Sequence, residues 1–334
     1  MRNFSINLIK AIACISVVML HCGFPGITGK LLYGIARFAV PFFFLVSGYF
    51  LYKEHKEDSV KSIPRKLKHI FKVLVVTEIV YLIWHSLQYT FLDNSTDLAL
   101  WLRGLFSGQS VFQFLILQTT YIGDVSWFLV ALCLCYISYY IIIKKNFWNK
   151  VVYLIPILLL INICFGEVLP KVGIQLPWNA CSNFWLLGFP FFMLGNWVHC
   201  NQDEILKRVT NKHLVLVVIG SIFLNLLERI FTDASQLFIS NISMATSLFI
   251  LAIKVPRPKW AENSILKHLA VIGDKYAVFV YILHPIIRDI IRYIVTTLEI
   301  ETNLLYLWIR PVCVFGISLY LGYIINKIQS KVIR

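Results

Sequence analysis

The sequence predicts an all-α fold, a polytopic membrane bundle of about ten transmembrane helices with the N-terminus and the C-terminus in the cytoplasm. Of the 334 residues, 58% are hydrophobic and 14% are charged, and the mean hydropathy is +0.74. A soluble domain has about 45–50% apolar and about 25% charged residues. The apolar residues also come in blocks of roughly 20, the length that crosses a hydrocarbon core. A soluble globule is excluded, and we expect one integral membrane domain over residues 1–334.

Apolar blocks bounded by charged residues define the expected spans. They are residues 5–23, 31–52, 70–91, 125–143, 151–166, 181–199, 213–231, 236–253, 268–291 and 304–326. The stretch from Leu98 to Gly123 is not counted, because its apolar run is short and polar residues interrupt the part before it.

The distribution of basic residues gives the orientation. Lysine and arginine number 31 against 17 acidic residues, and basic residues gather in cytoplasmic loops. With ten spans and a cytoplasmic N-terminus, the outside loops keep only Lys30, Arg103, Lys171 and Arg292. We therefore attribute the net charge of +14 to orientation and expect no nucleic-acid partner. The eight cysteines show no ligand-like spacing, which indicates neither a disulfide framework nor a metal site.

The first span carries two ionisable residues, Lys10 and His21. Such groups cost about 2.5–3.5 kcal/mol each at membrane depth and suggest function. Eleven residues bring a helix back to within about 20° of the same side and advance it by about 16 Å, so both should face one way. Histidine exchanges protons near neutral pH and can carry an acyl group. The alternatives are a snorkelling Lys10 and a packing His21.

The second span begins near the outer side with Arg37, which needs an anionic or carbonyl partner. Pro41 frees a backbone carbonyl, which is tolerated where the helix lines protein or a cavity. Gly48 is small enough for close helix packing, the role we expect for it.

Further polar residues are expected towards the outer side. Asp124, Ser126 and Trp127 lie between the third and fourth spans, where Trp127 is either an interface residue or an acceptor contact. The ninth span carries Tyr281, His284 and Arg288 on one stripe. The third span carries Glu78 and His85 on one face. These histidine, arginine and acidic residues suit either a catalytic site or a binding site for an anionic solute.

A basic cluster at the start of the third span contains Arg65, Lys66 and Lys68. Such a cluster could hold the phosphates of a nucleotide-like donor. The alternative is attraction to anionic lipid, worth about 1 kcal/mol per charge.

Together these residues resemble the acyltransferase-3 family of membrane O-acyltransferases. The resemblance extends from Asn7 to about Pro285. The matching pieces are Lys10 to His21, Arg37 leading into VPFFFLVSGY, the basic start of the third span, Ser126-Trp127-Phe128-Leu129, FPFFMLG ending at Gly195, and Tyr276 followed by Tyr281-Ile282-Leu283-His284-Pro285.

The resemblance implies transfer of an acyl group, usually acetyl from cytoplasmic acetyl-CoA, to a hydroxyl of a cell-envelope glycan or lipid-linked saccharide. It implies a multi-pass protein of the bacterial inner (plasma) membrane. By position, His21 would be catalytic, Lys10 its basic partner, and Arg65 with Lys68 the donor contacts. The family usually has arginine where Lys10 and Lys68 stand, and lysine lacks the two-pronged hydrogen bonding of a guanidinium.

We further expect Arg37, Asp124 and His284 to arrange the acceptor and the developing charge, with Tyr281 and Arg288 beside them. The leading alternative is a transporter of a small solute such as L-serine, without chemistry. It arises because the segment Arg37–Tyr49 resembles the membrane part of the membrane-bound serine racemases of vancomycin resistance. A glycan exporter or partner subunit is the third possibility, and it would not need His21.

Overall fold

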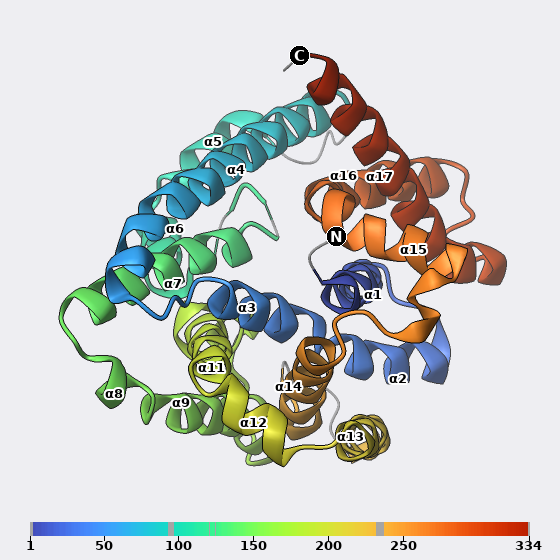
Figure 1. Ribbon diagram of the computed structural model, residues 1–334. Coiled ribbons are helices and arrows are strands. Elements are labelled where there is room, and N and C mark those ends of the chain that lie inside the picture. The colour runs from blue at the N-terminus through green and yellow to red at the C-terminus, as the bar shows by residue number, and fades with distance from the viewer. Residues whose placement is uncertain (1–2, 93–96, 120, 124, 232–236, 333–334) are drawn as a thin grey trace. The chain divides into compact units, whose positions relative to one another are not determined.

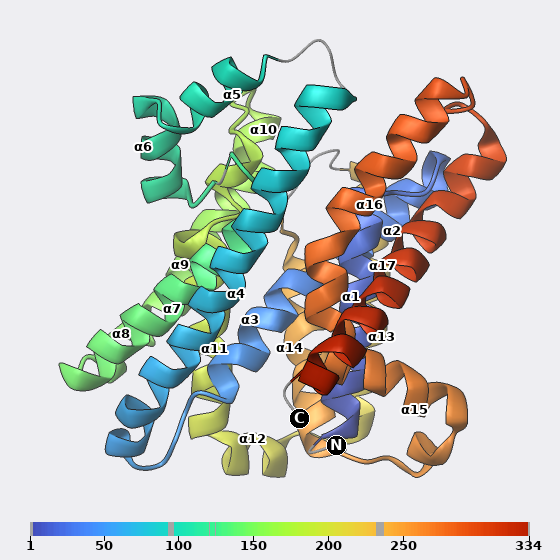
Figure 2. The ribbon, with the colours of Figure 1, turned by 90° about the horizontal axis from the view of Figure 1, so that it is seen from above.

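The computed structural model describes residues 3–92, 97–119, 121–123, 125–231 and 237–332. Throughout this part of the chain every regular element is a helix, which confirms the predicted fold class (Figures 1 and 2). The chain forms two compact units. Unit 1 comprises Met1–Phe43, Asp203–Asp233 and Phe238–Arg334, and unit 2 comprises Phe44–Gln202 and Ala234–Leu237.

Unit 1 contains the first helices of the chain and those of its C-terminal part. They are α1 (Phe4–His21), α2 (Gly26–Ala36), the start of α3 (Ala39–Tyr49), most of α12 (Gln202–Arg208), α13 (Asn211–Phe231), α14 (Ile239–Lys254), η4 (Lys259–Glu262), α15 (Ser264–Val271), the π-helical η5 (Ile272–Tyr276), α16 (Ala277–Thr297) and α17 (Leu304–Val332).

Unit 2 contains the rest of α3 and the helices of the middle of the chain. They are α4 (Lys56–Phe91), α5 (Leu98–Leu105), α6 (Gly108–Leu117), α7 (Trp127–Lys144), α8 (Trp148–Val151), α9 (Leu154–Ile163), η1 (Cys164–Val168), α10 (Leu169–Lys171), η2 (Trp178–Ala180), η3 (Phe184–Gly188) and α11 (Phe189–Cys200).

Seven segments of the described chain are helical, long and apolar enough to cross a membrane. They are Phe4–His21, Gly26–Tyr49, Lys56–Phe91, Trp127–Lys144, Trp148–Lys171, Asn211–Phe231 and Leu304–Lys331. The other three predicted spans fall on η3 with α11, on α14, and on η5 with α16. The chain is thus a multi-pass membrane protein. The number ten and the cytoplasmic termini stay predictions.

The second predicted span, residues 31–52, is not one continuous helix. α2 ends at Ala36 and α3 begins at Ala39, and tight turns at Arg37 and Phe38 separate them. Pro41 accounts for the break, because it has no N–H to donate to the Arg37 carbonyl four residues earlier.

α4 is longer than the third predicted span. Its 36 residues extend over about 54 Å, so most of the hydrophilic segment before that span is helical as well. The stretch Leu98–Gly123 forms α5 and α6, of eight and ten residues, each too short to cross a membrane. Figure 2 shows these two short helices towards the C-terminal end of α4.

In unit 1, α1 packs against η5, α16 and α17 (Figure 2). The closest approach is at Gly273, where a Cβ atom would lie 1.9 Å from the Asn7 carbonyl oxygen and 2.8 Å from the Ala11 nitrogen. Only glycine fits there. A buried apolar cluster joins α1, α16 and α17. It contains Cys14, Val18, Cys22, Ala277, Val280, Ile287 and Val314.

In unit 2, α3 and α11 meet backbone to backbone. A Cβ atom on Gly48 would lie 1.9 Å from the Phe192 carbonyl oxygen, and one on Gly195 would lie 2.0 Å from that of Leu45. Asn196 Nδ2 donates to the Gly48 carbonyl at 3.3 Å. The packing role predicted for Gly48 is therefore confirmed.

Candidate active site

One side of α1 carries polar side chains that face η5 and the start of α16. Asn7 Nδ2 donates to Asp274 Oδ1 at 3.1 Å, and the Asp274 carboxylate interacts electrostatically with the Lys10 ammonium. Two turns beyond Asn7, Cys14 Sγ lies 3.8 Å from the Ala277 carbonyl oxygen. The contact of Asn7 is with Asp274 and that of Cys14 is with Ala277, so both chains advance in the same direction. α1 therefore runs parallel to the η5–α16 segment.

At the end of α1, His21 lies against His284 of α16. Their ring centroids are 5.1 Å apart and the ring planes are tilted by 54°. The ring of Tyr281 is 6.3 Å from that of His284. Lys10 and His21 are both half-buried, and both face the η5–α16 segment, in keeping with their eleven-residue spacing.

His284 is fully buried, and its hydrogen bond fixes its tautomer. Its Nδ1 lies 3.0 Å from the Val280 carbonyl oxygen. A carbonyl oxygen only accepts, so the proton of the neutral ring is on Nδ1 and Nε2 keeps a lone pair. Nε2 is buried and has no hydrogen-bond partner among the described residues. This nitrogen can therefore accept an N–H from the neighbouring imidazole.

Two guanidinium groups add positive charge around His21. Arg288 Nε donates to Asp289 Oδ1 at 2.9 Å, with both side chains 15% exposed. Arg37 donates to the Tyr33 hydroxyl, and its guanidinium lies over that ring, 4.5 Å from the centroid. Both arginines interact electrostatically with the His21 imidazole.

A second arginine shares the Tyr33 ring. Arg229 of α13 is buried, with its guanidinium 5.4 Å from the Tyr33 centroid, and its Nε donates to the Lys30 carbonyl at 3.1 Å. Tyr33 thus lies beside two guanidinium groups, those of Arg37 and Arg229.

Four further ionisable residues, not among the predicted site residues, lie in the predicted spans: Arg229, Asp274, Asp289 and Arg310. Arg310 of α17 donates through Nη2 to the Gly23 carbonyl at 2.8 Å, just beyond the end of α1. A cation there is favourable, because the C-terminal end of a helix carries partial negative charge. These four residues could have been predicted by the same signal as Lys10, His21 and Arg288, which is an ionisable residue within an apolar span.

Ser126 and Trp127 belong to unit 2. Ser126 is fully buried just before α7, and its hydroxyl has no hydrogen-bond partner among the described residues. Trp127 is only 9% exposed and packs edge-on against Trp178 at 6.4 Å, so it is not a lipid-facing interface residue. Asp124 lies outside the described residues.

The predicted donor-binding residues lie near the N-terminal end of α4, also in unit 2. Arg65 and Lys68 are exposed, so their charged groups are accessible to an anion. Lys66 is half-buried, and its Nζ donates to the Phe50 carbonyl at 2.7 Å.

The structure therefore brings part of the predicted set together in unit 1: His21, His284, Tyr281, Arg37 and Arg288. An imidazole with nearby guanidinium groups suits proton transfer and stabilisation of a developing oxyanion. The described residues contain no group of three or more side chains suited to hold a metal ion, and none of the eight cysteines, all of which are described, forms a disulfide.

Comparison with curated proteins found no match, and comparison with solved structures found none either. A family model described as an acyltransferase domain matches residues 3–327, nearly the whole chain. Nothing in these comparisons supports the transport alternative or the link to serine racemases. The match fits the imidazole and guanidinium chemistry of unit 1, and the chain belongs to the acyltransferase-3 family of membrane acyltransferases.

Proposed function

We propose that this acyltransferase moves an acetyl group from cytoplasmic acetyl-CoA to a hydroxyl of a cell-envelope glycan or lipid-linked saccharide, in the inner membrane of a bacterium. The observation that carries the proposal is His21 beside the fully buried His284, whose Nε2 is an orphaned acceptor. An imidazole oriented by a second group is the usual form of a catalytic base.

In the reaction, His21 takes the proton of the acceptor hydroxyl. The oxygen then forms a bond to the acetyl carbonyl carbon, and the carbon–sulfur bond of the thioester breaks. The proton passes from the His21 imidazolium to the departing thiolate. A positioned base of this kind contributes about 10²- to 10⁴-fold in rate. His284 holds the His21 ring in the tautomer that leaves one nitrogen free to act.

The guanidinium groups of Arg37 and Arg288 stabilise the oxyanion that develops on the acetyl carbonyl. Their electrostatic interaction with His21 supports this role. Lys10, on the same side of α1, is the basic partner of His21 towards the donor.

The donor phosphates are assigned to Arg65, Lys66 and Lys68. The exposure of the Arg65 and Lys68 side chains supports the assignment. The acceptor contacts are assigned to Asp124, Ser126, Trp127, Tyr281 and Arg288. The Ser126 hydroxyl is buried and has no hydrogen-bond partner in the part of the chain that the structure describes, which supports its place among them.

The test uses a strain that lacks this protein, complemented with variants and fed heavy-isotope acetate. The wild type restores labelled envelope glycan, whereas His21→Ala lowers labelling by about 10²- to 10⁴-fold. His213→Ala is the matched control, because His213 is exposed on α13 and should leave labelling unchanged. Labelled glycan that persists in His21→Ala, or an equal loss in His213→Ala, overturns the proposal.

A further inference from the structure

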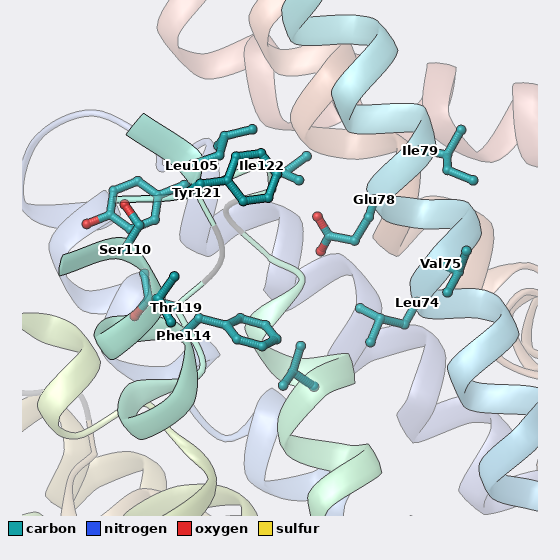
Figure 3. A pocket seen from close by; sticks show the side chains of 13 residues that line it. Leu74, Val75, Glu78, Ile79, Leu105, Ser110, Phe114, Thr119, Tyr121 and Ile122 are labelled. Atoms are coloured by element: carbon teal, nitrogen blue, oxygen red, sulfur yellow. The ribbon is translucent and has the colours of Figure 1, made fainter. Parts of the chain in front are cut away.

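Unit 2 contains a cavity of about 460 Å³ near the start of α7. It is lined by α4, α5, α6, the segment before α7 and one residue of α7 itself, as Figure 3 shows from close by. Ligand sites in proteins range over about 300–1,000 Å³, so the volume is that of a binding site. Most lining side chains are apolar, among them Leu74, Phe114 and Val130.

Glu78 of α4 points into this cavity (Figure 3). Both of its carboxyl oxygens are buried, and neither has a hydrogen-bond partner among the described residues. The Ser126 hydroxyl interacts with the carboxyl group, but the two do not meet hydrogen-bond geometry. A buried polar group without a partner is costly, and such groups are rare in native structures.

The other polar groups of the lining are already engaged. Thr119 Oγ1 accepts from Asn179 at 2.8 Å, the Tyr121 hydroxyl donates to Gln113 at 2.8 Å, and the Ser110 hydroxyl donates to a backbone carbonyl at 2.6 Å. The unmet hydrogen-bonding capacity of the cavity therefore belongs to the Glu78 carboxyl group.

The cavity also opens beside exposed apolar side chains, two of them on α4, a helix long and apolar enough to cross a membrane. Val75, Ile79, Val111 and Phe106 contribute to its lining and are exposed apolar side chains. On helices of a membrane protein such side chains contact lipid tails, which are as apolar as leucine. A hydrocarbon chain can thus enter from the bilayer without crossing water.

We propose that this cavity binds a single-chain amphiphile with a neutral hydroxyl head, whose O–H donates to the Glu78 carboxyl group. The chain lies against Leu74 and Phe114. A head with a carboxylate or phosphate is disfavoured, because it offers negative charge to an acidic group. The site does not depend on the transfer reaction, since binding needs no acyl donor.

The test uses the full-length protein in lipid nanodiscs with dodecanol that carries a photoreactive group in its chain. We expect labelling of α4 and α6 peptides, with dodecanol displacing the probe at least about tenfold better than dodecanoic acid. Glu78→Leu removes the acceptor and lowers labelling about tenfold. Glu78→Gln keeps an acceptor oxygen and retains most of the labelling.

A second pair of variants separates binding in the cavity from adsorption to the protein surface. Leu74→Trp fills the cavity and abolishes labelling, whereas Val76→Trp, exposed on another face of α4, leaves it unchanged. The proposal is overturned if Glu78→Leu labels like the wild type, if dodecanoic acid competes as well as dodecanol, or if Val76→Trp acts like Leu74→Trp. None of these outcomes depends on whether acetyl transfer occurs.

Discussion

The two units place carboxyl groups among apolar helices in opposite ways. In unit 1 the carboxyl groups of the polar network have partners: Asp274 accepts from Asn7, and Arg288 donates to Asp289. In unit 2 the Glu78 carboxyl group has no hydrogen-bond partner among the described residues and faces a cavity. A satisfied polar network holds its members in one arrangement, whereas a lone buried group leaves unused binding capacity. The first suits groups that must stay in register for chemistry, and the second suits a ligand.

The sharpest way to break the unit 1 network is at its closest backbone contact. Gly273→Ala places a Cβ atom 1.9 Å from the Asn7 carbonyl oxygen, so η5 must move away from α1. We expect the free energy of unfolding to fall by about 3 kcal/mol, as measured by titration with denaturing detergent.

Gly316→Ala is the matched control, because a Cβ atom there has no neighbour within 4 Å. Alanine in the interior of α17 should raise stability slightly, by up to about 1 kcal/mol. If Gly273→Ala behaves like Gly316→Ala, the backbone contact between α1 and η5 is wrong.

His284→Leu tests whether the buried imidazole positions His21. The substitution keeps an apolar body and removes the acceptor nitrogen, so we expect kcat to fall about 10- to 100-fold with little change in KM for acetyl-CoA. His284→Gln, which keeps an acceptor, should recover part of the rate.

His284→Leu added to His21→Ala should cause no further loss of kcat, because the two residues act together in the same step. Losses that multiply, or a rise in KM alone, would show that His284 acts elsewhere. Steady-state kinetics in nanodiscs with a radiolabelled donor measures both constants.

Several features of unit 1 were predictable from simple rules. The spacing of Lys10 and His21 placed both on one side of α1, because a helix repeats its direction after eleven residues. The cost of charge in hydrocarbon singled out Arg37, His284 and Arg288. These rules use only neighbours along one helix, and the shared side of Lys10 and His21 agrees with them; the roles of the residues stay predictions.

Other features depend on contacts between segments far apart in the chain. The partner of Lys10 is Asp274, which lies 264 positions away in sequence, and no periodicity in α1 points to it. The break in the second span was readable from Pro41 but was not predicted. The cavity at Glu78 lies where α5 packs against α4 and α6 packs against α5, both too short to span, a packing result that composition does not encode.

A double-mutant cycle on Lys10 and Asp274 tests whether the Lys10 ammonium lies within the polar network of unit 1. Lys10→Met and Asp274→Asn each remove one charge, and asparagine keeps the oxygen that accepts from Asn7. If the ammonium lies inside the bundle, the two changes should couple by about 1 kcal/mol in the free energy of unfolding. If Lys10 snorkels to the interface, the coupling is zero and the two effects add.

The smallest effect is expected where a charge cluster lies in water rather than among helices. Hydrogen bonds from Lys267 and Arg257, both 2.7 Å long, hold the pKa of Glu262 at about 2. A carboxyl group whose pKa is lowered on folding stabilises the protein at pH values above its ordinary pKa of 4.5. This stabilisation is lost as the pH falls towards 2. At pH 7, Glu262→Gln should therefore lower the melting temperature slightly, and the difference should vanish through that window. The difference in melting temperature should also shrink in 1 M salt. At that concentration the screening length is only about 3 Å, and these charges are exposed. The coupling of Lys10 with Asp274 should persist in the same salt, and a salt-sensitive coupling there would place that pair in water too.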